Sequence, residues 1–229
     1  MYNLDIPGWM PECQLQVIEK LAAKIPSESV MVEVGSYCGR SAYCWAKSVD
    51  PSVTVYCIDI WDIHRYKPRP NVTLGDDTPM DRDHGRVSSL EQVHPSLENF
   101  KANTRDCHNI VALQGASPHD FRSWPDQSVS LVFLDGLHSN PWYQNDLYFW
   151  YSKVVPGGII CGDDYSSGHS DVVWTTQNFA SLFGLTVLVH ERFWLIHKPP
   201  AWDPFDALPN IAESNWFESV AAGRARPSS

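Results

Sequence analysis

The feature that most constrains the fold is a series of short apolar runs, rich in β-branched residues, that alternate with segments of helical periodicity. Residues 29–34, 53–60, 109–114 and 129–135 are typical of strands, and residues 157–163 add a fifth after a Pro-Gly-Gly turn. Strands this uniformly apolar are buried on both faces, as in a parallel sheet covered by helices. The alternation therefore predicts an α/β fold with a doubly wound sheet.

Proline marks where two helices begin. Pro11 and Pro141 each precede a segment with apolar residues at helical spacing, and Pro is favoured at that position. The second pattern extends to Val154. A third helix is expected after residue 169, with Ser170 or Asp171 as its cap.

Two further strands are predicted at residues 185–190 and 193–198. Only Glu191 and Arg192 separate them, so they must pair as a tight antiparallel hairpin. The chain thus ends a mainly parallel sheet of seven strands with an antiparallel hairpin. This differs from the usual dinucleotide-binding arrangement.

The length of 229 residues suits one well-buried core, and residues 1–223 are predicted to form a single domain. Residues 62–94 have no sustained periodicity and are expected to be a lid or an insertion over the site. Residues 224–229 are expected to be a frayed tail.

Charge and composition exclude several classes of partner. A formal charge of −10 argues against binding nucleic acid or anionic lipid, because both require clustered Lys and Arg. No apolar stretch approaches the roughly 20 residues of a membrane span, and the start of the chain has no signal-peptide pattern. The six cysteines lack CxxC spacing and are interpreted as reduced thiols. A soluble cytoplasmic protein is expected.

The turn after the first strand reads VEVGSYCGRSA, residues 32–42. Gly35 and Gly39 stand where the backbone must turn sharply. The pattern is E-x-G-x-x-x-G rather than G-x-G-x-x-G, since Tyr37 replaces the second glycine. Glu33 would repel phosphates and attract an ammonium group. These features favour S-adenosylmethionine over NAD as the ligand of this turn.

Asp59 follows the second strand, where a carboxylate can accept hydrogen bonds from both ribose hydroxyls of a nucleoside. Either cofactor would use such an acid, so Asp59 supports a nucleoside site without choosing between them.

The segment EVGSYCGRSA resembles the cofactor loop of class I methyltransferases, particularly the catechol O-methyltransferase type. The likeness continues in QGASPHDF (114–121), in FLDGLH and in PGGIICGDDY. It implies a Rossmann-like fold with S-adenosyl-L-methionine as cofactor. The implied cofactor-binding residues are Glu33, Gly35, Tyr37, Gly39, Ser41, Asp59, Ser117 at the adenine and Asp135.

Asp163 and Asp164 directly follow an apolar strand, where paired negative charge requires a compensating partner. The resemblance implies that they join Asp135 in binding Mg²⁺ or a similar divalent cation. Three hard oxygen donors, with no Cys or His at binding spacing, agree with that ion. The structural alternative for the pair is a turn or capping role.

The catalytic base is expected to be His138, assisted by Asp135. Relatives of the catechol type carry a lysine at this position, three residues after the strand-four aspartate. The alternative is an ordinary loop histidine. His119 and His169 fall in loops without a recognisable ligand pattern and are assigned no role.

Together these features and the resemblance predict an S-adenosylmethionine-dependent, Mg²⁺-dependent O-methyltransferase for a small hydroxylated molecule. A homodimer is considered as its assembly. The alternatives are a metal-independent methyltransferase, an NAD-dependent oxidoreductase and a non-catalytic cofactor-binding module. The late aromatics Trp202, Phe205, Trp216 and Phe217 are expected to line a substrate pocket or a dimer interface, and Trp194 to lie in the core.

Overall fold

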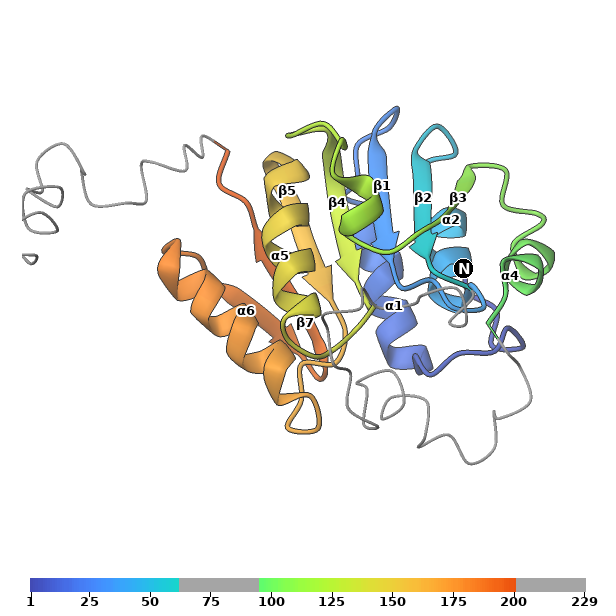
Figure 1. The fold of residues 1–229 in the computed structure, drawn as a ribbon. Helices are drawn as coiled ribbons and strands as arrows, with labels where there is room; N and C mark the ends of the chain where they lie inside the picture. Colours follow the sequence, from blue (N-terminus) through green and yellow to red (C-terminus); the bar gives the residue numbers. More distant parts are fainter. Residues whose placement is uncertain (62–94, 201–229) are drawn as a thin grey trace, which may run out of the picture.

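The computed structural model describes residues 1–61 and 95–200 of the chain (Figure 1). The predicted lid at 62–94, the predicted tail at 224–229 and the four late aromatics lie outside these residues. The boundary of the single domain at residue 223 does so too.

The described helices are α1 (Glu12–Ala22), α2 (Arg40–Ser48), α4 (Leu97–Asn103), the short 3-10 helix η1 (His119–Phe121), α5 (Trp142–Lys153) and α6 (Ser170–Leu182). The strands are β1 (Val30–Val34), β2 (Thr54–Asp59), β3 (Ile110–Gln114), β4 (Val129–Leu134), β5 (Val154–Gly162), β6 (Val187–His190) and β7 (Phe193–His197).

All seven strands form one sheet in the order β3-β2-β1-β4-β5-β7-β6. The first five pair in parallel, whereas β7 is antiparallel to both β5 and β6. The predicted mainly parallel sheet with a final antiparallel hairpin is therefore confirmed. The chain runs outward from β1 to β3 and then returns to β4 beside β1, so the carboxyl ends of β1 and β4 form the switch point where α/β sheets bind ligands.

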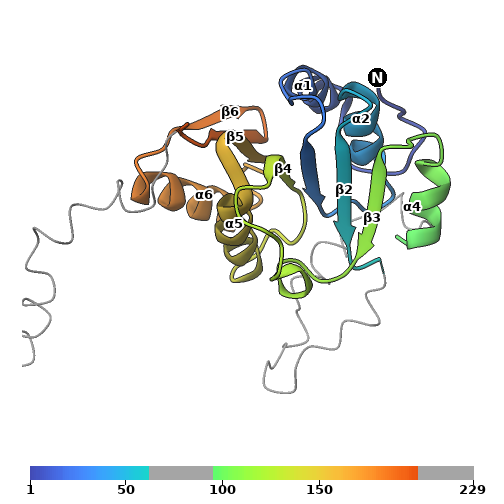
Figure 2. The same ribbon diagram turned by 90° about the horizontal axis from the view of Figure 1, so that it is seen from above.

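Helices cover both faces of the sheet (Figures 1 and 2). On one face α1 and α2 bury Leu15, Ile18 and Trp45 against the strands. On the other face α5 and α6 bury Trp150 and Phe179. Side chains alternate between the two faces along β1, so Met31 belongs to the first core while Val32 and Val34 belong to the second.

The helix starts at Pro11 and Pro141 are confirmed, because these residues occupy the N-cap positions of α1 and α5. Two details of the sequence interpretation are wrong. Val154 begins β5 instead of continuing α5. The N-cap of α6 is His169, and Asp171 Oδ2 instead accepts a hydrogen bond from the backbone N–H of Asn140 at 2.9 Å.

The cysteine and core predictions agree with the structure. All six cysteines are free thiols, and five of them are buried. Trp194 is fully buried. Among the helices of residues 1–61 and 95–200, none combines the length and the apolar character that crossing a membrane requires.

Candidate active site

The turn between β1 and α2 is built on two glycines with left-handed backbone. Gly35 has φ 89° and Gly39 has φ 96°. A Cβ on Gly35 would lie 2.1 Å from the carbonyl oxygen of Asp135, so no larger residue fits there. The glycine turn is therefore pressed directly against the end of β4.

Asp59 organises this turn from the end of β2. Its Oδ2 accepts a hydrogen bond from the backbone N–H of Tyr37 at 2.8 Å, and its Oδ1 accepts one from Trp61 at 2.9 Å. These bonds fix the orientation of the Asp59 carboxylate. Its binding of ribose stays a prediction.

Glu33 is fully buried, on the α1–α2 face of β1. Burial raises the pKa of its carboxyl to about 7, and the nearby hydroxyls of Ser36 and Ser41 only partly offset this effect. Neither carboxylate oxygen has a hydrogen-bond partner. The structure thus places Glu33 out of contact with solvent and beside Ser36 and Ser41, and its contact with a cofactor ammonium group stays a prediction.

Ser117, predicted to contact adenine, lies in a hydrogen-bonded network below the end of β3. Its hydroxyl donates to Asp146 Oδ1 at 2.5 Å and accepts from Trp150 Nε1 at 2.8 Å. Burial raises the pKa of Asp146 to about 7. Because the only proton of Ser117 is given to Asp146, this hydroxyl can act toward a ligand only as an acceptor.

The three predicted metal ligands converge. One carboxylate oxygen from each of Asp135, Asp163 and Asp164 lies within 4.8 Å of the others. Asp163 and Asp164 are both 6% exposed. Burial raises the pKa of Asp135 and Asp163 above the usual range, and Arg192 and Gln14 lower that of Asp163 in part. Three acidic groups brought together with little access to water are stabilised by a nearby cation.

His138 faces this cluster. Its Nε2 lies 2.9 Å from Asp164 Oδ2 and 3.6 Å from Asp135 Oδ1. The side chain is only 17% exposed, so the imidazole is held in place by its surroundings. It stands on the same side of the sheet edge as the carboxylates, which is the position that a proton acceptor beside them would need.

The sequence interpretation missed three neighbours of the aspartate pair. Gln14 of α1, which is 1% exposed, donates to Asp163 Oδ1 at 2.7 Å. His169 Nδ1 lies 3.2 Å from Asp164 Oδ1. The Arg192 guanidinium contacts the same oxygen of Asp164. Two histidines thus lie beside Asp164, although neither has a metal-binding spacing in the sequence.

The sheet register explains why Arg192 is there. Gly162 of β5 pairs with Trp194 of β7, so the residues that follow Gly162 lie opposite the hairpin turn. The backbone N–H of Tyr165 donates to the carbonyl of Arg192 at 2.9 Å and fixes this contact. Knowledge of the β5–β7 pairing would have revealed Arg192, whereas His169 gave no signal in the sequence.

Arg192 should stabilise the protein when no metal ion is bound. We expect Arg192→Gln to lower the free energy of unfolding by about 1–2 kcal/mol in EDTA at pH 8. The loss is smaller than the roughly 3–5 kcal/mol of a fully buried pair, because Arg192 is 48% exposed. Urea denaturation measures it, with the exposed Arg105→Gln as control. Equal stability of the two variants would contradict a structural role for Arg192.

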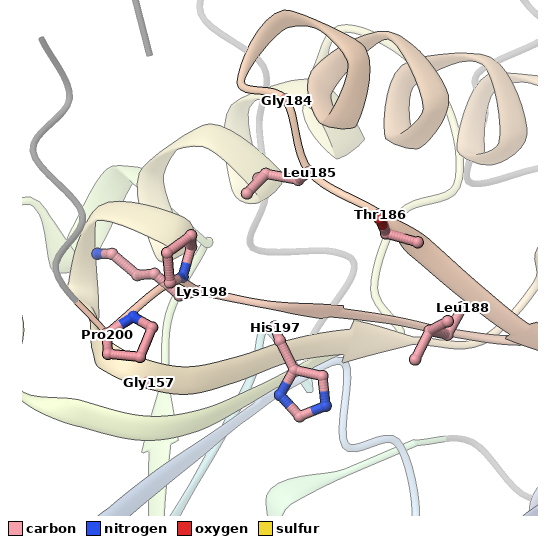
Figure 3. A pocket seen from close by; sticks show the side chains of 9 residues that line it. Gly157, Gly184, Leu185, Thr186, Leu188, His197, Lys198 and Pro200 are labelled. Atoms are coloured by element: carbon pink, nitrogen blue, oxygen red, sulfur yellow. The ribbon is translucent and has the colours of Figure 1, made fainter. Parts of the chain in front are cut away.

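A pocket elsewhere on the molecule is separate from this site. It lies at the opposite end of β5, between Gly157, Leu185, Leu188, His197 and Lys198 (Figure 3). Lys198 donates from Nζ to the carbonyls of Tyr151 and Val154, so its ammonium group caps carbonyls at the C-terminal end of α5. No residue of the aspartate cluster or of the glycine turn lines this pocket.

Comparison with known families agrees with this geometry. A family model described as a methyltransferase domain matches residues 32–165, from the glycine turn to the residue after the aspartate pair. This chain belongs to that family. The class I methyltransferase recognised from the sequence is thereby confirmed, and the match favours methyl transfer over the NAD-dependent alternative.

Several solved structures with similar folds are described as methyltransferases. The O-methyltransferase NovP is 17% identical with a TM-score of 0.60, and the match covers 81% of this chain and 79% of NovP. TomG from Streptomyces achromogenes, an O-methyltransferase of tomaymycin synthesis solved with S-adenosylmethionine, is 13% identical with a TM-score of 0.55, covering 86% of this chain and 83% of TomG. At these identities the likeness concerns the fold.

Proposed function

We propose that this methyltransferase is an S-adenosylmethionine-dependent, divalent-cation-dependent O-methyltransferase for a small hydroxylated molecule. The observation that carries the proposal is the contact between Gly35 and the backbone of Asp135. Through it the predicted cofactor turn adjoins the aspartate cluster at the switch point of the sheet. A methyl donor in that turn and a cation on those aspartates would be neighbours.

The donor set fits a divalent cation. Asp135, Asp163 and Asp164 would hold Mg²⁺ or a similar ion with oxygen atoms that already lie within 4.8 Å of one another. When both are bound, S-adenosylmethionine would supply an electrophilic methyl group and the ion would lower the pKa of the acceptor hydroxyl.

The protein's own residues would position the reactants and remove the proton. Asp59 and the 35–39 turn would hold the nucleoside and the methionine part, and fixing the reacting atoms is worth up to about 7–11 kcal/mol in favourable cases. His138 would take the acceptor's proton at Nε2, while Asp164 and Asp135 stabilise the imidazolium that forms.

A metal-independent methyltransferase is the second candidate, and one observation favours it. Arg192 already contacts Asp164 and lies 3.7 Å from Asp163, so part of the negative charge is compensated without an ion. In that case the aspartates would serve to position the hairpin turn and His138.

Chelation separates the two candidates. The protein is incubated with S-adenosylmethionine and a panel of phenols, catechols and sugars, and both S-adenosylhomocysteine and methylated product are quantified. We expect EDTA to abolish turnover and added divalent cations to restore it. Full turnover in EDTA would establish the metal-independent reaction. Cofactor binding without product from any acceptor would support a non-catalytic module. A homodimer and a cytoplasmic location stay predictions.

A further inference from the structure

A nitrogen donor lies beside the predicted oxygen ligands. Atoms of His138, Asp164 and His169 that can bind a metal lie within 4.8 Å of one another, and this group shares Asp164 with the three aspartates. The two imidazoles face different oxygens of Asp164: His138 lies at Oδ2 and His169 at Oδ1. Each carboxylate oxygen of Asp164 thus has an imidazole nitrogen beside it.

Arg192 marks the position of a cation within this group. Its Nη2 contacts Asp164 Oδ1 and lies 3.7 Å from Asp163 Oδ2. His169 Nδ1 lies 3.2 Å from the same Asp164 oxygen. An ion in place of the guanidinium nitrogen would therefore have carboxylate oxygens of Asp163 and Asp164 beside it, and His169 Nδ1 lies next to the same Asp164 oxygen.

The guanidinium can make way for such an ion. The Arg192 side chain is 48% exposed, whereas the side chains of Asp163 and Asp164 are 6% and 8% exposed. The half-exposed arginine can therefore turn into solvent more readily than the buried carboxylates can. The ion would then replace the guanidinium as the positive charge that compensates the buried carboxylates.

The chemistry of the donors decides which ion fits. Mg²⁺ favours oxygen ligands, whereas imidazole suits first-row transition metals such as Fe²⁺, Co²⁺ and Zn²⁺. We infer that this site takes a first-row transition-metal dication in preference to Mg²⁺, with His169 Nδ1 as its nitrogen ligand. The inference rests on the divalent-cation site of the proposed function, and it leaves His138 at the other oxygen of Asp164 as the base.

Titration calorimetry of the full chain with Co²⁺ and with Mg²⁺ tests this inference. The chain is first freed of metal by a chelator, and the titration is run at pH 8 because imidazole binds a metal in its neutral form. We expect the wild type to bind Co²⁺ more tightly than Mg²⁺. His169→Gln should weaken Co²⁺ binding by about tenfold or more, since even an outer-shell partner of a metal is worth about 10–100-fold. Its Mg²⁺ affinity should change by less than about twofold, and the exposed His108→Gln should alter neither.

The proton NMR spectrum of the Co²⁺-loaded wild type gives a second readout that needs no variant. A hyperfine-shifted, exchangeable imidazole proton is expected if a histidine binds the ion, and it should be absent from His169→Gln. Lack of this signal in the wild type, or equal losses of Co²⁺ and Mg²⁺ affinity in His169→Gln, would overturn the inference.

These results can be told apart from failure of the proposed function. Methyl transfer that Mg²⁺ supports and that does not depend on His169 would contradict the inference but support the proposed function. Binding of Co²⁺ through His169 without methyl transfer to any acceptor would support the inference but contradict the proposed function. If no divalent cation binds, the inference is wrong and the metal-independent reaction becomes the candidate.

Discussion

Replacing His138 by glutamine is expected to lower the rate of methyl transfer by about 10²–10⁴-fold, the usual contribution of a positioned general base. The expectation follows from the position of Nε2, which lies 2.9 Å from Asp164 and 3.6 Å from Asp135 at the edge of the aspartate cluster. Glutamine retains a hydrogen-bonding side chain of similar reach but cannot accept the proton. The loss should appear in kcat with little change in the affinity for S-adenosylhomocysteine.

Two comparisons make this result specific to a base. The exposed His108→Gln should keep full activity. Calorimetry with S-adenosylhomocysteine should give the same affinity, within about twofold, for His138→Gln and wild type. Retained turnover in His138→Gln would assign the proton to another group, whereas lost cofactor binding would place His138 in the donor pocket.

Replacing Glu33 by glutamine is expected to stabilise the protein at pH 8 and to leave its stability at pH 5 nearly unchanged. The pKa of the Glu33 carboxyl is raised from 4.5 to about 7 by burial. The folded state therefore holds this proton more tightly than the unfolded state does. The free energy of unfolding falls as pH rises from about 4.5 to about 7 and then stays low, by about 3 kcal/mol for this shift. Glutamine is neutral throughout this range, so the variant does not show this fall in the free energy of unfolding.

Urea denaturation of both proteins at pH 5 and pH 8 measures the effect as a double difference, which removes the contribution of the other titrating groups. The exposed Glu98→Gln should follow the wild type at both pH values. A fall in stability between pH 5 and pH 8 that is the same in Glu33→Gln and wild type would contradict the burial argument. The same variant also tests whether Glu33 attracts the cofactor's ammonium, because affinity for S-adenosylhomocysteine should then decrease.

Much of the fold follows from local patterns. Uniformly apolar strands separated by helices leave few arrangements other than a covered parallel sheet. Two residues between the last strands permit only a hairpin. Errors occurred where a tertiary contact competes with a local preference. Asp171 is a good N-cap residue, but its carboxylate is used by Asn140 of a distant loop.

The candidate site divides in the same way. The sequence could predict that Asp135, Asp163 and Asp164 lie close together, because each follows a strand and parallel strands end at one edge of a sheet. The neighbours of these aspartates could not be predicted. His169 reaches Asp164 through the path of a loop, and Gln14 reaches Asp163 from a helix at the other end of the chain.

By itself the sequence determined the order of strands and helices, the left-handed glycines of the first turn and the acidic residues at the strand ends. Each of these depends on backbone sterics and side-chain periodicity within a few residues. Only the tertiary structure decided that Glu33 is buried under α2, that Ser117 gives its proton to Asp146, and that Arg192 lies against Asp164. Those contacts depend on strand register and on packing between distant segments, which no local pattern encodes.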